Sequence, residues 1–188
     1  HETALRELAE KTGFAAEPAH LEQLQTYSTP GRDARDSKMR VTSVAYLAFM
    51  PDPGTPRAGS DARLARFWAV DDLPEFNSEL TCEDGPTLAF DHAAMLRDGL
   101  ERAASKLEYT TLATAFVDEQ FTISDLRRVY EAVWRNSIDA PNFSRKVKSA
   151  SGFIESTGGK RATGRAPAGL FVKGEADIIS PPFFRPIE

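Results

Sequence analysis

The chain has 188 residues, of which 41% are hydrophobic and 27% are charged, a balance that is ordinary for globular proteins and excludes fibrous and disordered classes. No apolar run is as long as a membrane span, and the first residues lack a signal-peptide pattern, so we expect a cytoplasmic protein without a membrane partner. A single cysteine, Cys82, excludes an internal disulfide, and the dispersed residues His1, His20 and His92 disfavour a zinc site.

The first elements predict a helix, a loop and a strand. Leu5 and Leu8 recur at helical spacing, and Gly13 supplies the stop expected at a helix C-terminus. Residues 28–39 form a loop rich in charge, proline and glycine, and residues 40–50 (RVTSVAYLAFM) read as a largely buried strand. We therefore expect the first part of the chain to be mixed α/β.

The next segment is a flexible connector at residues 51–61, followed by RFWAV at residues 66–70, which we expect to be another strand. From Asp91 the apolar positions follow the three-and-four spacing of an amphipathic helix that reaches Leu107. This helix is expected to be the last element of a first domain.

A capped helix is predicted at FTISDLRRVYEAVW. Thr122 is its expected N-cap and Asp125, three residues on, completes an acidic capping box, while Phe121 and Leu126 form a hydrophobic staple. A short turn then leads to a second helix, with Asp139 as its cap.

The second helix is basic on its outer side. Phe143 and Val147 are expected to face inward, and Gly152 to end the helix. Two strand-like runs then flank residues 157–167, a loop with three glycines and three basic residues. Helix, turn, basic helix and basic hairpin are the order of a winged helix-turn-helix.

The charge distribution supports nucleic-acid binding by this part. The net charge is −5, yet between residues 142 and 174 seven basic residues stand against Glu155 alone. Asn142 could bond an adenine edge and Arg145 or Lys146 a guanine, while the hydroxyls of Thr122 and Ser124 suit phosphate. The further expected DNA contacts are Lys148, Lys160, Arg161 and Arg165. RNA is the weaker alternative, because the arrangement lacks aromatic pairs that stack single-stranded bases.

The stretch RELAEKTGF, residues 6–14, resembles the end of the Nudix box. In that family the box is a loop and helix whose carboxylates hold magnesium against a diphosphate, and the resemblance makes Arg6, Glu7 and Glu10 candidates for effector binding, with Glu7 and Glu10 as metal ligands. Lys11 stands where the family has a further glutamate, and an ammonium group there opposes a divalent cation. Hydrolysis is therefore expected to be impaired, with residual ADP-ribose pyrophosphatase activity left open.

Nearly the whole chain resembles the NrtR family of Nudix-related transcriptional regulators. The stretches that carry the resemblance include LEQLQTYSTPGRDARDSKMRVTSVAYLAF, LAFDHAAML, KLEYT and NFSRKVKSASGFIESTG. It implies a Nudix-like α/β/α sandwich at residues 1–112, whose first strands would fall before residue 1, and a winged helix-turn-helix at residues 113–188.

The resemblance further implies a bacterial repressor of NAD biosynthesis or salvage genes that binds a palindromic operator as a homodimer. Its effector would be ADP-ribose or a related NAD-derived nucleotide, with no required cofactor and Mg²⁺ open as a companion of the nucleotide. In the loop at residues 28–39, Arg32 and Arg35 could contact a pyrophosphate, although a solvated connector fits equally well. Two rivals are an active ADP-ribose hydrolase whose C-terminal module only docks or dimerises, and a DNA-binding protein whose Nudix part is only a scaffold.

Overall fold

The computed structural model describes residues 2–14, 17–32, 40–60, 62–77, 80–81, 85–162 and 166–186. The chain divides into two units, His1–Gly99 and Leu100–Glu188, and the division falls inside a helix. Each unit is described by itself. None of the helices in the described ranges is long and apolar enough to cross a membrane.

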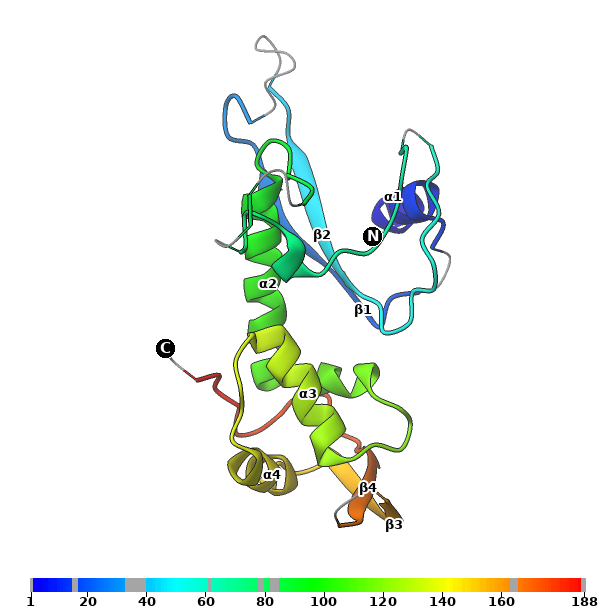
Figure 1. The fold of residues 1–188 in the computed structure, drawn as a ribbon, viewed down its shortest axis with the longest axis vertical. Coiled ribbons are helices and arrows are strands. Elements are labelled where there is room, and N and C mark those ends of the chain that lie inside the picture. The colour runs from blue at the N-terminus through cyan, green and yellow to red at the C-terminus, as the bar shows by residue number, and fades with distance from the viewer. Residues whose placement is uncertain are drawn as a thin grey trace. The chain divides into compact units, whose positions relative to one another are not determined.

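The first unit contains an antiparallel hairpin of β1 (His20–Tyr27) and β2 (Ser43–Phe49). Before it comes α1 (Glu2–Thr12), and after it come the short 3₁₀ helix η1 (Val70–Asp72) and the first part of α2 (His92–Tyr109). The helices α1 and α2 and the two strands are labelled in Figure 1. Gly13, at φ +72°, closes α1 in the left-handed conformation that its sequence position predicts.

The two faces of this hairpin meet different helices. Val44, Tyr46 and Ala48 line a cavity together with side chains of α1. On the other face Leu24 and Leu47 lie against Gly99 of α2. The layering is therefore helix, sheet, helix, as expected for a Nudix-like α/β/α arrangement, with two strands in the described part of the sheet.

One element of this unit was not predicted from the sequence, and one expectation needs correction. β1 was not anticipated because a bulge between Gln23 and Gln25 interrupts the period of two, so that Leu21 and Leu24 mimic helical spacing. The strand expected at residues 66–70 is absent from the described structure: the segment is irregular up to Val70, where η1 begins, and Phe67 is 59% exposed. The apolar composition of residues 66–70 favours a strand, but in the described structure no neighbouring strand pairs with this segment.

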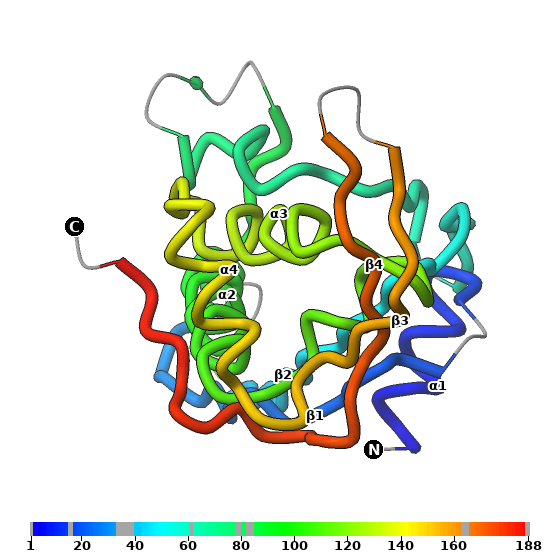
Figure 2. Tube along the Cα trace, turned by 90° about the horizontal axis from the view of Figure 1, so that it is seen from below, coloured from blue at the N-terminus to red at the C-terminus, as the bar shows by residue number. Residues whose placement is uncertain are grey.

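The second unit continues α2 and adds η2 (Thr111–Phe116), α3 (Ile123–Trp134) and α4 (Ala140–Ser149). A hairpin of β3 (Ile154–Arg161) and β4 (Ala168–Lys173) follows, and we call it the wing. Figure 2 shows these elements of the unit together. The predicted capping box is confirmed: Thr122 accepts from the Asp125 N–H, and the Asp125 carboxylate accepts from the Thr122 N–H.

The core of the second unit is aromatic. Tyr130 stands edge-on to Trp134 and Phe143, with ring centroids 4.9 Å and 5.2 Å away. Phe153 packs against the ring of Phe183, which reaches the core from the C-terminal tail. Phe183 is 3% exposed, so the irregular C-terminal tail contributes to this core.

Two boundaries in this unit differ from those read from the sequence. β3 runs to Arg161 and so includes residues that were expected to be loop, because Gly158, at φ +74°, forms a bulge that lets the ladder resume at Lys160. α4 ends at Ser149, before Gly152. The chain divides after Gly99, and Leu107, in the second half of α2, belongs to the core of the second unit. A functional boundary near Leu112 stays a prediction.

Candidate functional site

α4 exposes the cations expected to meet DNA. Its first turn is capped by the Asp139 carboxylate, which accepts from the Asn142 N–H at 2.9 Å. Phe143 and Val147 are buried, as predicted, so the remaining helix surface faces solvent. The exposed basic side chains of that surface are Arg145, Lys146 and Lys148.

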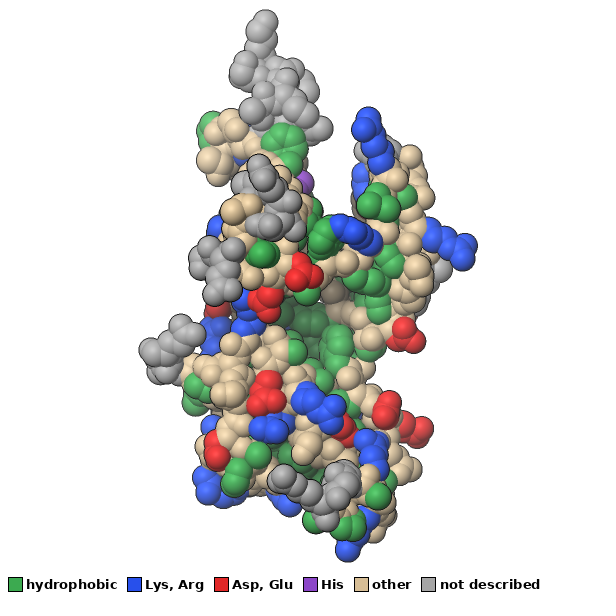
Figure 3. Space-filling view, in the orientation of Figure 1, with side chains coloured by type: hydrophobic (Ala, Val, Ile, Leu, Met, Phe, Trp, Pro, Cys, Tyr) green, Lys and Arg blue, Asp and Glu red, His purple; other side chains and the backbone are tan. Residues whose placement is uncertain are grey.

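Two of the predicted base-reading side chains already contact each other. Arg145 donates from Nη2 to the Asn142 Oδ1 at 2.7 Å on the exposed side of α4. This bond leaves the Asn142 amide nitrogen and the other Arg145 nitrogens available as donors. In Figure 3 several Lys and Arg side chains lie at the end of the second unit that α4 and the wing form, and others lie elsewhere on the same unit. The helix therefore offers both charge and hydrogen-bond donors on one surface.

The hydroxyl of Thr122 is engaged in the cap of α3. It donates to the Asp125 Oδ2 at 2.9 Å and accepts from the Asp125 N–H at 3.2 Å, and the residue is 2% exposed. These contacts favour capping over the phosphate contact proposed from the sequence. Ser124, two residues further on, is exposed.

The wing carries Lys160 and Arg161 in different surroundings. Lys160 is exposed, and no hydrogen bond of its side chain is seen among the described residues. Arg161 instead pairs from Nη1 with the Asp125 Oδ2 at 2.8 Å and donates from Nη2 to the Gln120 carbonyl at 2.7 Å. Arg165 lies outside the described residues.

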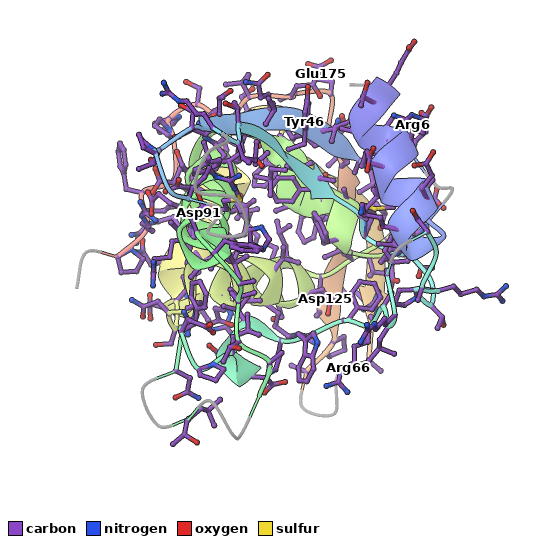
Figure 4. All side chains as sticks on the ribbon, turned by 90° about the horizontal axis from the view of Figure 1, so that it is seen from above. Arg6, Tyr46, Arg66, Asp91, Asp125 and Glu175 are labelled. Atoms are coloured by element: carbon purple, nitrogen blue, oxygen red, sulfur yellow. The ribbon has the colours of Figure 1, made fainter. Side chains whose placement is uncertain are left out.

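α1 holds the candidates taken from the Nudix-like stretch. Arg6 pairs with Glu10 at 3.0 Å and approaches Glu7 at 3.7 Å, and all three side chains are about half exposed. Figure 4 labels Arg6 on α1 and Tyr46 on β2. Glu7 and Lys11 line the cavity of about 650 Å³ between this helix and the hairpin, whereas Glu10 does not.

This arrangement bears on metal binding. Within the described ranges, no group of three His, Cys, Asp or Glu side chains could hold a metal ion. Glu7 and Lys11 both line the cavity, and a bare divalent cation requires more oxygen ligands than one carboxylate provides. Magnesium binding by Glu7 and Glu10 therefore stays a prediction.

Arg32 is the second effector candidate, and its side chain is almost completely buried. Its guanidinium makes a two-pronged pair with the Asp91 carboxylate, at 2.8 Å and 2.7 Å, and donates to the Ser43 hydroxyl at 2.9 Å. The side chain is 5% exposed. These contacts tie β2 to the start of α2 and favour a structural role, while Arg35 lies outside the described residues.

A second cavity, of about 730 Å³, lies beside the end of α1 and was not anticipated. Phe14 stacks on Phe67 with ring centroids 5.7 Å apart, and the Arg66 guanidinium lies 3.4 Å from the Trp68 ring centre. The sequence signal is one arginine followed by two aromatic residues in RFWAV, a composition that predicted a strand.

The winged part of the chain is matched by a family model. The model, described as the NrtR DNA-binding winged helix domain, matches residues 113–172. Over 170 residues the chain is 26% identical to the ADPR responsive transcriptional repressor NtrR of Acinetobacter baylyi. That match covers 89% of this chain and 61% of the relative, so the chain spans less than two thirds of the relative's length.

Solved structures extend the similarity to both units. Shewanella oneidensis NrtR is 30% identical with a TM-score of 0.63, and the match covers 97% of this chain and 76% of that one. Its complex with a 27mer DNA matches at 25% identity and a TM-score of 0.60, over 98% and 76% of the two chains. A MutT/nudix family protein from Enterococcus faecalis matches at 25% identity and a TM-score of 0.60, over 92% and 68%. These matches and the winged-helix model together show that the chain belongs to the NrtR family.

Proposed function

We propose that this chain is a transcriptional regulator that binds double-stranded DNA through α4 and the wing. The observation that carries the proposal is the surface of α4, where Phe143 and Val147 are buried and every basic side chain points outward. A helix of this kind fits the major groove, and its arginine and lysine donors suit guanine edges. Support comes from the family model and from the Shewanella relative, whose structure contains DNA.

The effector is proposed to be ADP-ribose or a related NAD-derived nucleotide. The Acinetobacter relative is named as ADPR responsive, and in this chain Lys11 offers a positive charge inside a cavity large enough for a small ligand. On the same helix, the Arg6 guanidinium lies close to the carboxylates of Glu7 and Glu10. Binding of the nucleotide would weaken DNA binding, and by linkage DNA would weaken nucleotide binding by the same factor.

The Nudix-like unit is proposed to bind the nucleotide as a sensor, without hydrolysing it. Lys11 lies in the cavity beside Glu7, where it would repel a bound divalent cation. No cofactor is required, and Mg²⁺ would enter only as a companion of the nucleotide's phosphates. The alternative, an active ADP-ribose hydrolase, predicts AMP release by the purified protein with magnesium at enzyme-like rates, and that result would refute the sensor assignment.

The gene targets and the assembly are taken from the family. We propose repression of NAD biosynthesis or salvage genes by a homodimer on a palindromic operator. Two-fold symmetry of the protein would then match the symmetry of two half-sites.

A gel shift tests the central claim. The probe is a duplex of the intergenic DNA upstream of the protein's own gene, with and without ADP-ribose. We expect a shift that ADP-ribose weakens, and calorimetry should detect heat on mixing nucleotide and protein. A shift that ADP-ribose leaves unchanged, with no calorimetric heat, would favour a constitutive DNA-binding protein.

Variants of α4 test the recognition surface. Arg145→Ala or Lys146→Ala should each cost about 1 to 3 kcal/mol of DNA-binding free energy. Lys173→Ala is the matched control, because Lys173 lies at the end of the hairpin away from its loop, opposite Ile154, and pairs with Asp177 at 3.1 Å. Equal affinities for the wild type and both α4 variants would contradict the assignment of α4.

A further inference from the structure

The carboxylate of Asp125 connects α3 with the wing. Its Oδ2 accepts from the N–H and the hydroxyl of Thr122, both at 2.9 Å, and from Nη1 of Arg161 at 2.8 Å. Its Oδ1 accepts from Nη2 of Arg128 at 2.8 Å. Three of these donors belong to α3 and its cap, whereas Arg161 is the last residue of β3. Figure 4 labels Asp125 on α3.

Arg161 reaches a second acceptor on the segment that precedes α3. Its Nη2 donates to the Gln120 carbonyl at 2.7 Å, so one planar guanidinium connects two fixed acceptors. The Asp118 carboxylate lies further away, at 3.8 Å, and is largely exposed. Arg161 therefore fastens the end of β3 to residues on both sides of the α3 cap.

The other strand of the wing is attached to the same segment through the backbone. The Phe121 N–H donates to the Phe171 carbonyl at 2.9 Å, and the Phe171 N–H donates to the Phe121 carbonyl at 2.8 Å. β4 thus has a main-chain attachment. β3 has its attachment through the Arg161 side chain, next to Lys160, which is exposed.

We propose that Arg161 is a positioning residue of the wing, which acts through Asp125 and Gln120 to hold the hairpin where Lys160 reaches the DNA backbone. The inference rests on the proposed DNA-binding function and changes the role expected for Arg161 from the sequence. A guanidinium that already donates from Nη1 to a carboxylate at 2.8 Å and from Nη2 to a carbonyl at 2.7 Å has fewer donors to offer a phosphate. Lys160 supplies the contact, and Arg161 fixes its place.

The substitutions Arg161→Gln and Asp125→Asn separate positioning from phosphate contact. If Arg161 positions the wing, each variant should lower affinity for the upstream duplex by about tenfold, since each removes a hydrogen bond between charged groups. The double variant should then be no weaker than the weaker single variant, because both changes break the same link. If Arg161 contacts phosphate, Asp125→Asn should instead raise affinity, because it removes a negative charge and releases the arginine. That outcome would overturn the proposal.

The salt dependence gives a second distinction. Lys160→Gln should reduce the slope of log K against log salt by about 1, as expected for one lost phosphate contact, and adding Arg161→Gln to it should reduce the slope no further, because Arg161 acts through the Lys160 contact. A further reduction of about 1 in the double variant would show that Arg161 contacts a phosphate itself and would overturn the proposal. Arg161→Lys keeps the charge but cannot reproduce the two-pronged geometry, so it should bind as weakly as Arg161→Gln. Recovery of affinity by Arg161→Lys would overturn the proposal.

Arg128→Gln is the matched control. Arg128 pairs with the same carboxylate but lies on α3 itself and is 72% exposed, so its loss leaves the link to β3 intact. In the Arg128→Gln variant, the backbone amides of the wing should exchange hydrogen at the same rates as in the wild type.

Hydrogen exchange makes the test independent of DNA. Amides of β3 should exchange faster in Arg161→Gln and Asp125→Asn than in the wild type, while those of α2 stay protected. Unchanged exchange in the wing of both variants would overturn the inference. Failure of the wild type to bind the duplex, with faster wing exchange in the variants, would refute DNA binding of this probe while supporting the link.

Discussion

The interior of the first unit and the interior of the second unit are stabilised by different kinds of contact. Among the buried hydrophobic side chains described, Tyr27, Phe49 and Leu73 belong to the first unit and the others belong to the second. The first unit relies on polar links between its strands and α2. Tyr27 donates to the Asp98 carboxylate at 2.6 Å, and the Arg32 guanidinium pairs with Asp91.

The second unit is therefore stabilised mainly by apolar burial, which has no preferred direction, and the first unit depends more on directional polar contacts. An apolar core stabilises in proportion to the area removed from water, whereas a buried pair depends on both partners being in place. The first unit also exposes several large apolar side chains in its described part. They are Val44, Leu64, Phe67, Trp68 and Phe90. The same type of substitution should therefore have different consequences in the two units.

The largest difference is expected for truncation of a core phenylalanine. Phe153→Ala, at a side chain with 0% exposure, should cost about 3 to 5 kcal/mol of unfolding free energy through lost burial and the resulting cavity. Phe49→Ala in the first unit, at 8% exposure, should cost less because fewer buried neighbours surround it. Chemical denaturation followed by segment-resolved hydrogen exchange measures both, and an equal or reversed order would contradict the comparison.

Breaking the Arg32 pair should affect the first unit alone. Arg32→Gln removes the two-pronged partner of Asp91 and the donor to Ser43, so amides of β2 and the start of α2 should exchange faster. Arg66→Gln is the control, because that exposed guanidinium lies over Trp68 and its substitution leaves the Asp91 pair intact. Protection of β2 equal to that of the wild type would show that the pair contributes nothing to the first unit.

The sequence predicted the second unit well because its signals are local. Thr122 and Asp125 are three residues apart, and the spacing of Phe143 and Val147 determines which side chains of α4 face outward. The roles of Arg32 and Arg161 were not predictable in this way. Their partners, Asp91 and Asp125, lie 59 and 36 residues away in the chain, and no spacing rule connects them.

The first unit also shows how a local irregularity hides an element. β1 was missed because its bulge moves Leu24 out of register with Leu21. RFWAV has strand composition, yet pairing is a property of two segments, and the described structure gives it no partner strand. Composition therefore indicated the kind of residue that the unit uses but not its arrangement.

A smaller effect is expected from the cap of α3. Thr122→Ala removes the acceptor for the Asp125 N–H and should cost about 1 kcal/mol of unfolding free energy. Ser124→Ala is the matched control, since Ser124 is exposed and makes no cap bond. The comparison uses urea unfolding, and a greater loss from Ser124→Ala would contradict the capping role. If Thr122 also contacted phosphate, its variant would lose DNA affinity beyond the loss explained by unfolding.

The smallest expected effect concerns acid, below the ordinary aspartate pKa of about 3.9, where a different carboxyl group should control the stability of each unit. Burial alone would raise the pKa of the Asp125 carboxyl, but bonds from Thr122 and the charges of Arg161 and Arg128 outweigh burial and lower it. In the first unit, the hydrogen bonds from Arg32 lower the pKa of Asp91.

A carboxyl whose folded-state pKa is lowered contributes stability that is fully present above the ordinary aspartate pKa of about 3.9. The contribution is lost as the pH falls from there through the lowered pKa, because the unfolded state binds the proton first. We therefore expect Asp125→Asn to flatten the acid dependence of amide protection in the second unit, and Asp91→Asn to flatten it in the first. If either variant flattened both units equally, the two polar links would not be independent, and the contrast between a core-stabilised unit and a pair-stabilised unit would not hold.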